Sequence, residues 1–140
     1  MSFELHPRLA ADCFVVGRFE LSLLLLMNDA RYPWFILVPQ RAGISEIHQL
    51  SGALRQLLMS ESAALSEALA VGFDADKINI AALGNIVSQL HVHHIARYTS
   101  DPAWPAPVWG TFPAIHYTDG AQLDVIRRLS SHLPAESLSG

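Results

Sequence analysis

The fold is decided by residues 84–97, which read Gly84-Asn85-Ile86-Val87-Ser88-Gln89-Leu90-His91-Val92-His93-His94-Ile95-Ala96-Arg97. Three of the seven histidines of the chain stand within four positions there. Successive side chains of a β-strand point to opposite faces. We therefore expect a strand with one polar face, made of Asn85, Gln89, His91 and His93, and one mostly apolar face, made of Ile86, Leu90, Val92 and His94. An amide and two imidazoles in a row on a half-buried strand predict a site.

The composition limits the class of protein to which this strand can belong. The chain has 140 residues, of which 51% are hydrophobic and 16% are charged, so we expect one domain over residues 1–140 with a sizeable core. So few charges favour a subunit interface about as much as a well-filled core. The lone Cys13 excludes an intrachain disulfide, and the amino terminus does not resemble a leader, so we expect a cytoplasmic protein.

Charge and hydropathy also limit the partners. A net charge of −4 gives no basic surface for nucleic acid, so we expect no nucleic-acid partner. The longest apolar run, residues 21–27, is far too short to span a membrane, so we expect no membrane partner.

Apolar patterning and turn residues predict the elements on either side of the histidine strand. Runs rich in β-branched and apolar residues predict strands, and apolar residues at spacings of three and four predict helices. Strands are expected at 13–20, 21–27, 34–39 and 76–82, with Gly17 marking a bulge and Leu83-Gly84 making a tight connection into the histidine strand.

Two helices are expected. The longer covers residues 45–72, with Ser45 as its cap and Gly72 at its end, and the last is capped by Asp119 and stops before Pro134. Residues 3–12 are expected to be an irregular lead-in with at most one helical turn, and the proline-rich residues 101–113 a loop. The predicted fold is therefore α+β, with a mainly antiparallel sheet of about five strands, the long helix on its far face and the site on its near face.

Two stretches of the sequence carry a family resemblance. The run Gln89-Leu90-His91-Val92-His93-His94-Ile95 resembles the signature of the histidine triad (HIT) family of nucleotide hydrolases and transferases, whose pattern is His-apolar-His-apolar-His-apolar-apolar. Residues 28–50, with Asn28, Gly43 and Leu50 at matching places, are similar to the paired strands and helix start of that family. The resemblance is to a bacterial branch that has Gln in place of the first triad histidine, and the loop 101–110 resembles that branch too.

The resemblance implies a chemistry for the two histidines of the polar face. His91 holds the place of the nucleophile, which attacks an α-phosphorus and forms a covalent nucleotidyl-histidine, while His93 would hydrogen-bond the phosphate oxygens. An imidazole with its ordinary pKa of about 6.5 is mostly neutral at pH 7 and so can act as a nucleophile. The implied substrate is a dinucleoside polyphosphate or a nucleoside phosphoramidate, the implied assembly is a homodimer, and no cofactor is implied.

The same resemblance assigns four substrate-binding positions. Gly84 and Asn85 match a Gly-amide pair near the phosphate, where a backbone without side chain lets N–H groups approach oxygen atoms. Asn79 resembles a further amide on phosphate, and Asn28 matches an asparagine that relatives use on the ribose hydroxyls. His94, on the opposite face, is expected to be a hydrogen-bonded structural residue.

Gln89 is where the chain departs from the family pattern. Its amide could support His91 or a phosphate oxygen, but an amide cannot carry a proton. A nucleotide-binding or partner-binding protein with little turnover therefore remains an alternative to the enzyme. A third alternative is a zinc site on His91 and His93, but no third ligand lies nearby in the sequence, so we expect no metal.

Overall fold

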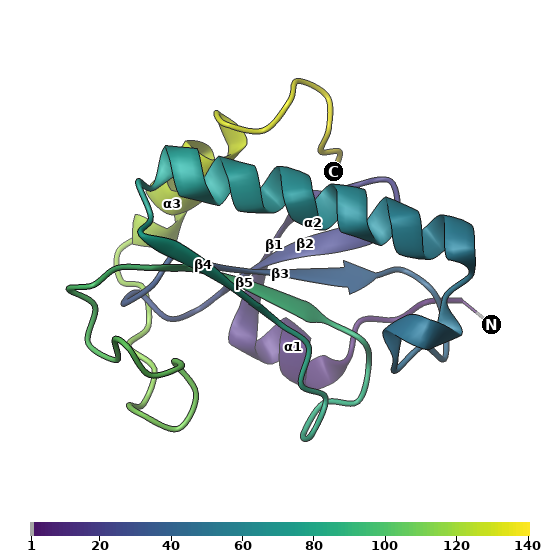
Figure 1. The fold of residues 1–140 in the computed structure, drawn as a ribbon, viewed down its shortest axis with the longest axis horizontal. Coiled ribbons are helices and arrows are strands. Elements are labelled where there is room, and N and C mark those ends of the chain that lie inside the picture. Colours follow the sequence, from purple (N-terminus) through teal and green to yellow (C-terminus); the bar gives the residue numbers. More distant parts are fainter. Residues whose placement is uncertain (1) are drawn as a thin grey trace.

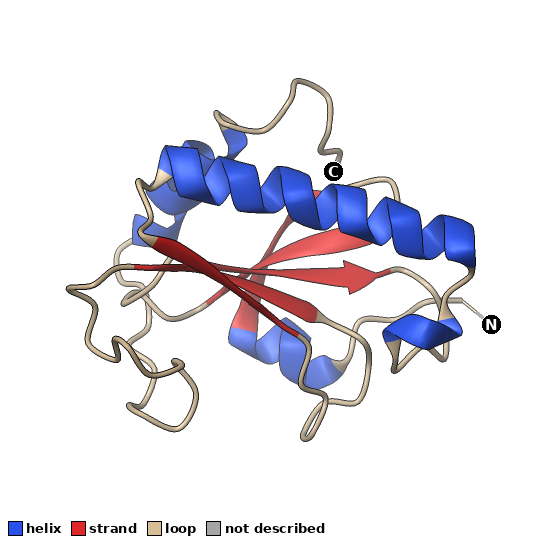
Figure 2. Ribbon diagram, viewed as in Figure 1, coloured by secondary structure: helices blue, strands red, loops and turns tan. Residues whose placement is uncertain are grey.

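The computed structural model describes residues 2–140, and its strands form one antiparallel sheet with the order β1-β2-β3-β5-β4 (Figures 1 and 2). This five-stranded sheet with its helices confirms the predicted α+β fold class. In chain order the elements are α1 (Pro7–Asp12), β1 (Cys13–Arg18), β2 (Ser22–Met27), β3 (Trp34–Pro39), the 3₁₀ turn η1 (Ile47–Gln49), α2 (Gly52–Gly72), β4 (Lys77–Ala81), β5 (Val92–Arg97) and α3 (Ala121–Ser130).

Helix α2 covers one face of the sheet, as expected, and makes the larger core with it (Figure 1). Leu24 of β2, Leu37 of β3 and Leu65 and Leu69 of α2 are completely buried there. Burying each such side chain contributes about 1.5–3 kcal/mol. His94 of β5 points into this core and is completely buried, so the placement predicted for it is confirmed.

His94 is held from both ring nitrogens. Its Nδ1 lies 3.0 Å from the Val92 carbonyl oxygen, and its Nε2 lies 2.7 Å from Ser62 Oγ. Because a carbonyl only accepts, Nδ1 carries the proton, and the Ser62 hydroxyl donates to Nε2. Both nitrogens are therefore used within the core, which makes His94 a structural residue.

The opposite face is covered by α1 and by the loop 101–113. Arg97 anchors this loop: only 1% exposed, it donates to both carboxylate oxygens of Asp101, at 2.8 and 3.0 Å, and to the Ala106 carbonyl at 2.8 Å. A two-point contact of this kind fixes orientation as well as distance. The loop is thus an ordered cover, and it brings Trp109 to the near face of the sheet, against Trp34.

The expected start of the long helix, at Ser45, is wrong. Helix α2 begins at Gly52, and its cap is Ser51, whose Oγ accepts from the Leu54 N–H at 3.2 Å. The Gln49 side chain accepts from the backbone N–H groups of Ser45 and Glu46, at 2.8 and 3.1 Å, and closes η1 as a separate turn. The apolar spacing runs through both segments, which is why it did not show the break.

The histidine strand is shorter than expected, and the predicted tight connection at Leu83-Gly84 is wrong. Strand β5 covers only Val92–Arg97, and residues 82–91 form a loop between β4 and β5. Gly84 has φ +80°, a conformation that favours glycine. Leu90 is buried and donates its N–H to the Ile44 carbonyl at 2.9 Å, which draws the loop away from β4. Asn85 therefore does not extend the strand face that carries His93.

Smaller differences lie at element ends. The strands predicted at 13–20, 21–27 and 76–82 are each shorter by one or two residues at one or both ends, and the pairing register shifts between Val15 and Gly17, where a bulge was predicted. The last helix is capped by Gly120 with φ 77°, so the cap expected at Asp119 is also wrong. The lead-in does contain a helix, α1.

Candidate active site

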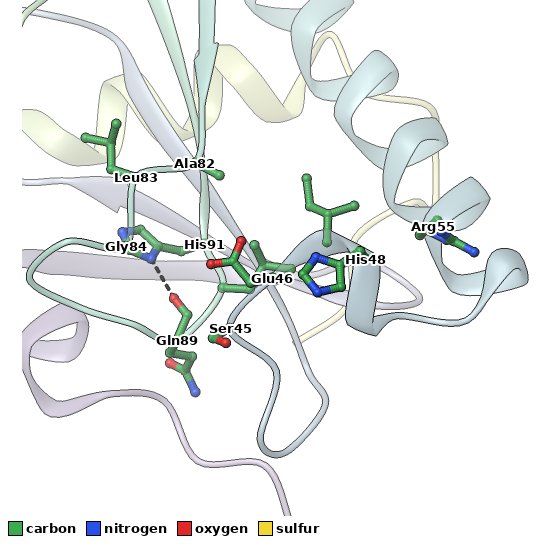
Figure 3. Close-up of a pocket in the computed structure, with 11 residues that line it drawn as sticks. Ser45, Glu46, His48, Arg55, Ala82, Leu83, Gly84, Gln89 and His91 are labelled. Carbon is green, nitrogen blue, oxygen red and sulfur yellow. Dashed lines mark hydrogen bonds between the residues drawn. The ribbon is translucent and has the colours of Figure 1, made fainter.

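His91 lies at the end of the 82–91 loop, immediately before β5, with one ring nitrogen held by the backbone. Its Nδ1 is 2.7 Å from the carbonyl oxygen of Gln89 (Figure 3). Since that oxygen only accepts, Nδ1 carries the hydrogen, and in a neutral ring Nε2 therefore keeps its lone pair. The contact therefore presents the nitrogen needed for nucleophilic attack without any further proton transfer. The side chain is largely enclosed, with the residue 7% exposed.

His93 is held in the opposite tautomer. The indole N–H of Trp34 donates to its Nδ1 at 2.9 Å, so the hydrogen of a neutral His93 ring resides on Nε2. Burial, together with the smaller effects of the neighbouring His91 and His94 rings, lowers the pKa of His93 to about 3. His93 is therefore a neutral imidazole at pH 7, and its free nitrogen is a hydrogen-bond donor.

The two imidazoles form a complementary pair. Their ring centroids are 4.9 Å apart in an edge-to-face arrangement. His91 offers a lone pair, which can attack phosphorus, and His93 offers an N–H, which can stabilise a phosphoryl oxygen.

Two hollows meet at His91. One, of about 360 Å³, is mostly apolar and lies between α1, the 82–91 loop and Trp109; both His91 and His93 line it. The other, of about 420 Å³, has a mixed lining; in this polar cleft, so named for its charged side chains, Glu46, His48 and Arg55 lie across from Leu83 and Gly84 (Figure 3). The lining of the apolar hollow includes Leu9 and Met27, and Arg8 and Asp12 bring charge to it.

Gln89 makes its contact with His91 through the backbone. Its side-chain Oε1 accepts from the His6 N–H at 2.9 Å, and its Nε2 donates to the Glu4 carbonyl at 2.8 Å. Both ends of the amide are thus engaged by the amino-terminal segment. The support expected from the amide is given to His91 by the carbonyl of the same residue.

The four predicted substrate-binding residues lie in different places. Gly84 lines both hollows, and Asn85 lines the apolar one, so the structure brings these two together with His91. Asn28 follows Met27, and its Oδ1 accepts from the Tyr117 N–H at 2.9 Å. Asn79 pairs with Ile95 along the sheet, and its Oδ1 accepts from Arg97 at 2.7 Å, so this oxygen serves the loop anchor.

Two tryptophans belong to the site although the sequence did not point to them. Trp34 donates a hydrogen bond to His93, and Trp109 contacts the same ring edge-on with a centroid separation of 5.0 Å. Trp34 and Ile36 share a strand face, and Ile36 pairs with His93. The signal was therefore the strand register of β3 against β5, which the sequence alone does not reveal.

Neither a metal-ligand cluster nor a spanning helix occurs in the described part of the chain. Within residues 2–140, no three His, Cys, Asp or Glu side chains are placed to hold one metal ion. No helix within these residues has the length and apolar character needed to cross a membrane.

Comparison with known proteins identifies the class. The sequence matches the family model of the HIT domain over residues 8–100, so the chain belongs to the HIT domain family, whose members are generally nucleotide-binding hydrolases and transferases. Among curated proteins, none matches the chain.

Several solved structures are close relatives. A histidine triad protein from Marinobacter aquaeolei VT8 is 50% identical, with a TM-score of 0.94, and the match covers 99% of this chain and 100% of that one. One from Sinorhizobium meliloti 1021 is 44% identical with a TM-score of 0.92, covering 94% and 97% of the two chains. One from Bradyrhizobium japonicum is 42% identical with a TM-score of 0.92, covering 96% and 100%.

Proposed function

We propose that this protein is a nucleotide hydrolase or transferase that acts on the α-phosphorus of a dinucleoside polyphosphate or a nucleoside phosphoramidate through a covalent nucleotidyl-His91. The observation that carries the proposal is the 2.7 Å contact between His91 Nδ1 and the Gln89 carbonyl, because in a neutral imidazole it places the hydrogen on Nδ1 and leaves the Nε2 lone pair free to attack. The complementary tautomer of His93 supports it.

The first step joins His91 to phosphorus. The Nε2 lone pair forms an N–P bond, the bond from phosphorus to the leaving group breaks, and the leaving group takes the electron pair. The positive charge that develops on the imidazole is stabilised by the Gln89 carbonyl at Nδ1–H. The His93 Nε2–H donates to a phosphoryl oxygen, which favours the transition state in an enclosed site.

The second step releases the nucleotide. A water oxygen, or another acceptor, attacks phosphorus, the N–P bond breaks, and His91 recovers its lone pair while the acceptor gives up a proton to solvent. Splitting one displacement into two steps in this way is the usual advantage of covalent catalysis. The apolar hollow beside Leu9 and Met27 is the proposed nucleoside pocket, with Gly84 and Asn85 nearest the phosphate and Asn28 next to Met27.

The covalent intermediate is directly testable. Protein mixed with α-labelled diadenosine polyphosphate and quenched in alkali within milliseconds should retain label on one histidine, which peptide mass spectrometry should place at His91. His91→Ala should retain none and should lose turnover. The His48→Ala variant is the control, because this exposed histidine lies across the polar cleft. Normal turnover by His91→Ala would refute the mechanism.

The alternative function is nucleotide or partner binding with little turnover. The engagement of both ends of the Gln89 amide favours it, since this position then supplies no group to the reaction. Calorimetric binding of a nucleoside monophosphate, without turnover of any polyphosphate or phosphoramidate, would select this alternative.

We also propose that the chain forms a cytoplasmic homodimer without nucleic-acid or membrane partners. Strand β4 is an edge strand of the sheet, and Ile80 on this strand and Leu83 in the loop that follows it are 52% and 50% exposed. An uncovered edge with apolar side chains favours pairing with a second copy. Sedimentation velocity at micromolar concentration should show a dimer, and a monomer there would refute this assignment.

A further inference from the structure

The most unusual contact in the site is the hydrogen bond from Trp34 to His93. An indole N–H can only donate, so the His93 Nδ1 that receives it at 2.9 Å must be unprotonated. Trp34 is itself fixed, being 6% exposed and packed edge-on against Tyr32 and Trp109 with centroid separations of 6.3 and 5.7 Å. The donor therefore cannot turn away to admit a proton at Nδ1.

His93 is enclosed on its other sides as well. Trp109 and His91 flank its ring, and the residue is 4% exposed. An imidazolium here would set a second N–H against the indole N–H, with both hydrogens between two nitrogens. The charged form is thus disfavoured by a lost hydrogen bond as well as by burial.

A neutral His93 cannot serve as a general acid, and the other groups around His91 do not supply one. Gln89 cannot carry a proton, and both ends of its amide are occupied. The His91 Nδ1–H is held by a carbonyl, and its Nε2 is the attacking atom. The charged groups on the apolar hollow are Arg8 and Asp12, and those on the polar cleft are Glu46, His48 and Arg55; all five are exposed. In the part of the chain that the structure describes, none of these side chains hydrogen-bonds to His91 or His93, so none is held beside the reacting pair as a positioned general acid.

From this arrangement we propose that Trp34 is a positioning residue that locks His93 as a neutral Nε2–H donor, and that the site consequently expels its leaving group without protonating it. The preferred substrates are then phosphoric anhydrides, such as dinucleoside polyphosphates. This inference rests on the proposed function and narrows its two substrate classes to one.

The chemistry of the two leaving groups explains why the site should prefer anhydrides to phosphoramidates. When a phosphoric anhydride reacts, the His91–phosphorus bond forms, the P–O bond breaks, and the departing oxygen keeps the electron pair as a stable phosphate anion. When an alkylamine phosphoramidate reacts, the P–N bond breaks and the nitrogen must gain a proton as it leaves. Positioned general acids contribute roughly 10²–10⁴-fold, so a site without one should disfavour the amine by a factor of that order.

The tautomer can be read directly in the unsubstituted protein. Long-range ¹H–¹⁵N correlation spectra at pH 7 should show the Nδ1 of His93 as an unprotonated nitrogen and Nε2 as a protonated one. In Trp34→Phe, which keeps a ring but lacks the N–H, the His93 signals should move toward a mixture of tautomers. Trp109→Phe is the matched control, because Trp109 touches the same ring without a hydrogen bond, and it should leave the tautomer unchanged. An Nδ1–H tautomer or an imidazolium in the native protein would overturn the role of Trp34.

The leaving-group preference is tested with paired derivatives of one nucleotide. kcat/KM should be at least about 10²-fold higher for a diadenosine polyphosphate than for an adenosine phosphoramidate of an alkylamine, if a general acid is missing. Among aryl esters of the same nucleotide, the rate should fall steeply as the phenol becomes less acidic. Equal rates for anhydride and phosphoramidate would overturn the inference and leave the covalent mechanism intact. Absence of turnover with every substrate would instead refute the proposed function, and the spectra would still decide the role of Trp34.

Discussion

Lowering the pH from 7 to 5 should destabilise this protein through two buried histidines. The pKa of His93 is lowered to about 3 by burial and by the neighbouring His91 and His94, and burial lowers that of His94 to about 4, partly opposed by its hydrogen bond to Val92. The unfolded chain binds a proton at each of these residues near pH 6.5, while the folded chain does not. Stability is therefore lost as the pH falls below 6.5, and the loss continues until the folded-state values are reached.

The magnitude follows from this linkage. Integrated from pH 7 to pH 5, each histidine costs about 2 kcal/mol, so the pair should lower the free energy of unfolding by about 4 kcal/mol. Asp29 and Asp101, whose pKa values are lowered by hydrogen bonds to Arg31 and Arg97 against the opposing effect of burial, act below this window. Carboxylates of that kind lose their contribution only as the pH falls through about 4 and lower.

Urea unfolding followed by tryptophan fluorescence at pH 7 and pH 5 measures the loss. The variant His93→Gln keeps an acceptor for the Trp34 N–H and removes one of the two titrations. The free energy of unfolding that this variant loses between the two pH values should be about half of what the native protein loses, whatever the variant's stability at pH 7. An equal loss in the two proteins would show that His93 is not held neutral by the fold.

Four other outcomes follow from contacts described above. His93→Ala should lower turnover by about 10²–10³-fold while the label on His91 still forms, because one of several donors to the phosphate is lost. Asp101→Asn leaves the buried Arg97 uncompensated and should cost about 3–5 kcal/mol in urea unfolding, and a cost below 1 kcal/mol would contradict the anchor. Ser51→Ala should lower stability by about 1 kcal/mol and Ser45→Ala by clearly less, since only Ser51 caps α2. Turnover should survive dialysis against a chelator, and parallel loss of activity and of stoichiometric zinc would support the metal alternative.

The sequence predicted those features that repeat along the chain. Runs of β-branched and apolar residues placed the strands, and spacing of three and four placed α2, because each pattern extends over many residues. The break between η1 and α2 could not be predicted from this spacing, since it depends on the single side chain of Gln49 closing a turn. The length of β5 was overestimated for a related reason: the hydrogen bond from the Leu90 N–H to the Ile44 carbonyl joins segments far apart in the chain.

The site was predictable only where it lies within one stretch. His91, His93, Gly84 and Asn85 are close in sequence and meet around the apolar hollow. The Trp34 contact required the register of β3 against β5, and the roles of Glu4 and His6 required knowing where the amino terminus lies. These depend on how separate segments pack, which a local pattern does not encode.

The two bonds of Gln89 to Glu4 and His6 have a consequence for how this protein can change over evolutionary time. The amide at position 89 donates a hydrogen bond to one backbone group and accepts one from another. An imidazole has a different reach and would have to give up at least one of these hydrogen bonds. Introducing a titrating side chain there by one substitution would therefore loosen the amino-terminal segment before any chemical benefit appeared. Position 89 and residues 4–6 should accordingly vary together among descendants of this chain, so that a histidine at position 89 becomes accessible only after the amino-terminal segment has found another attachment.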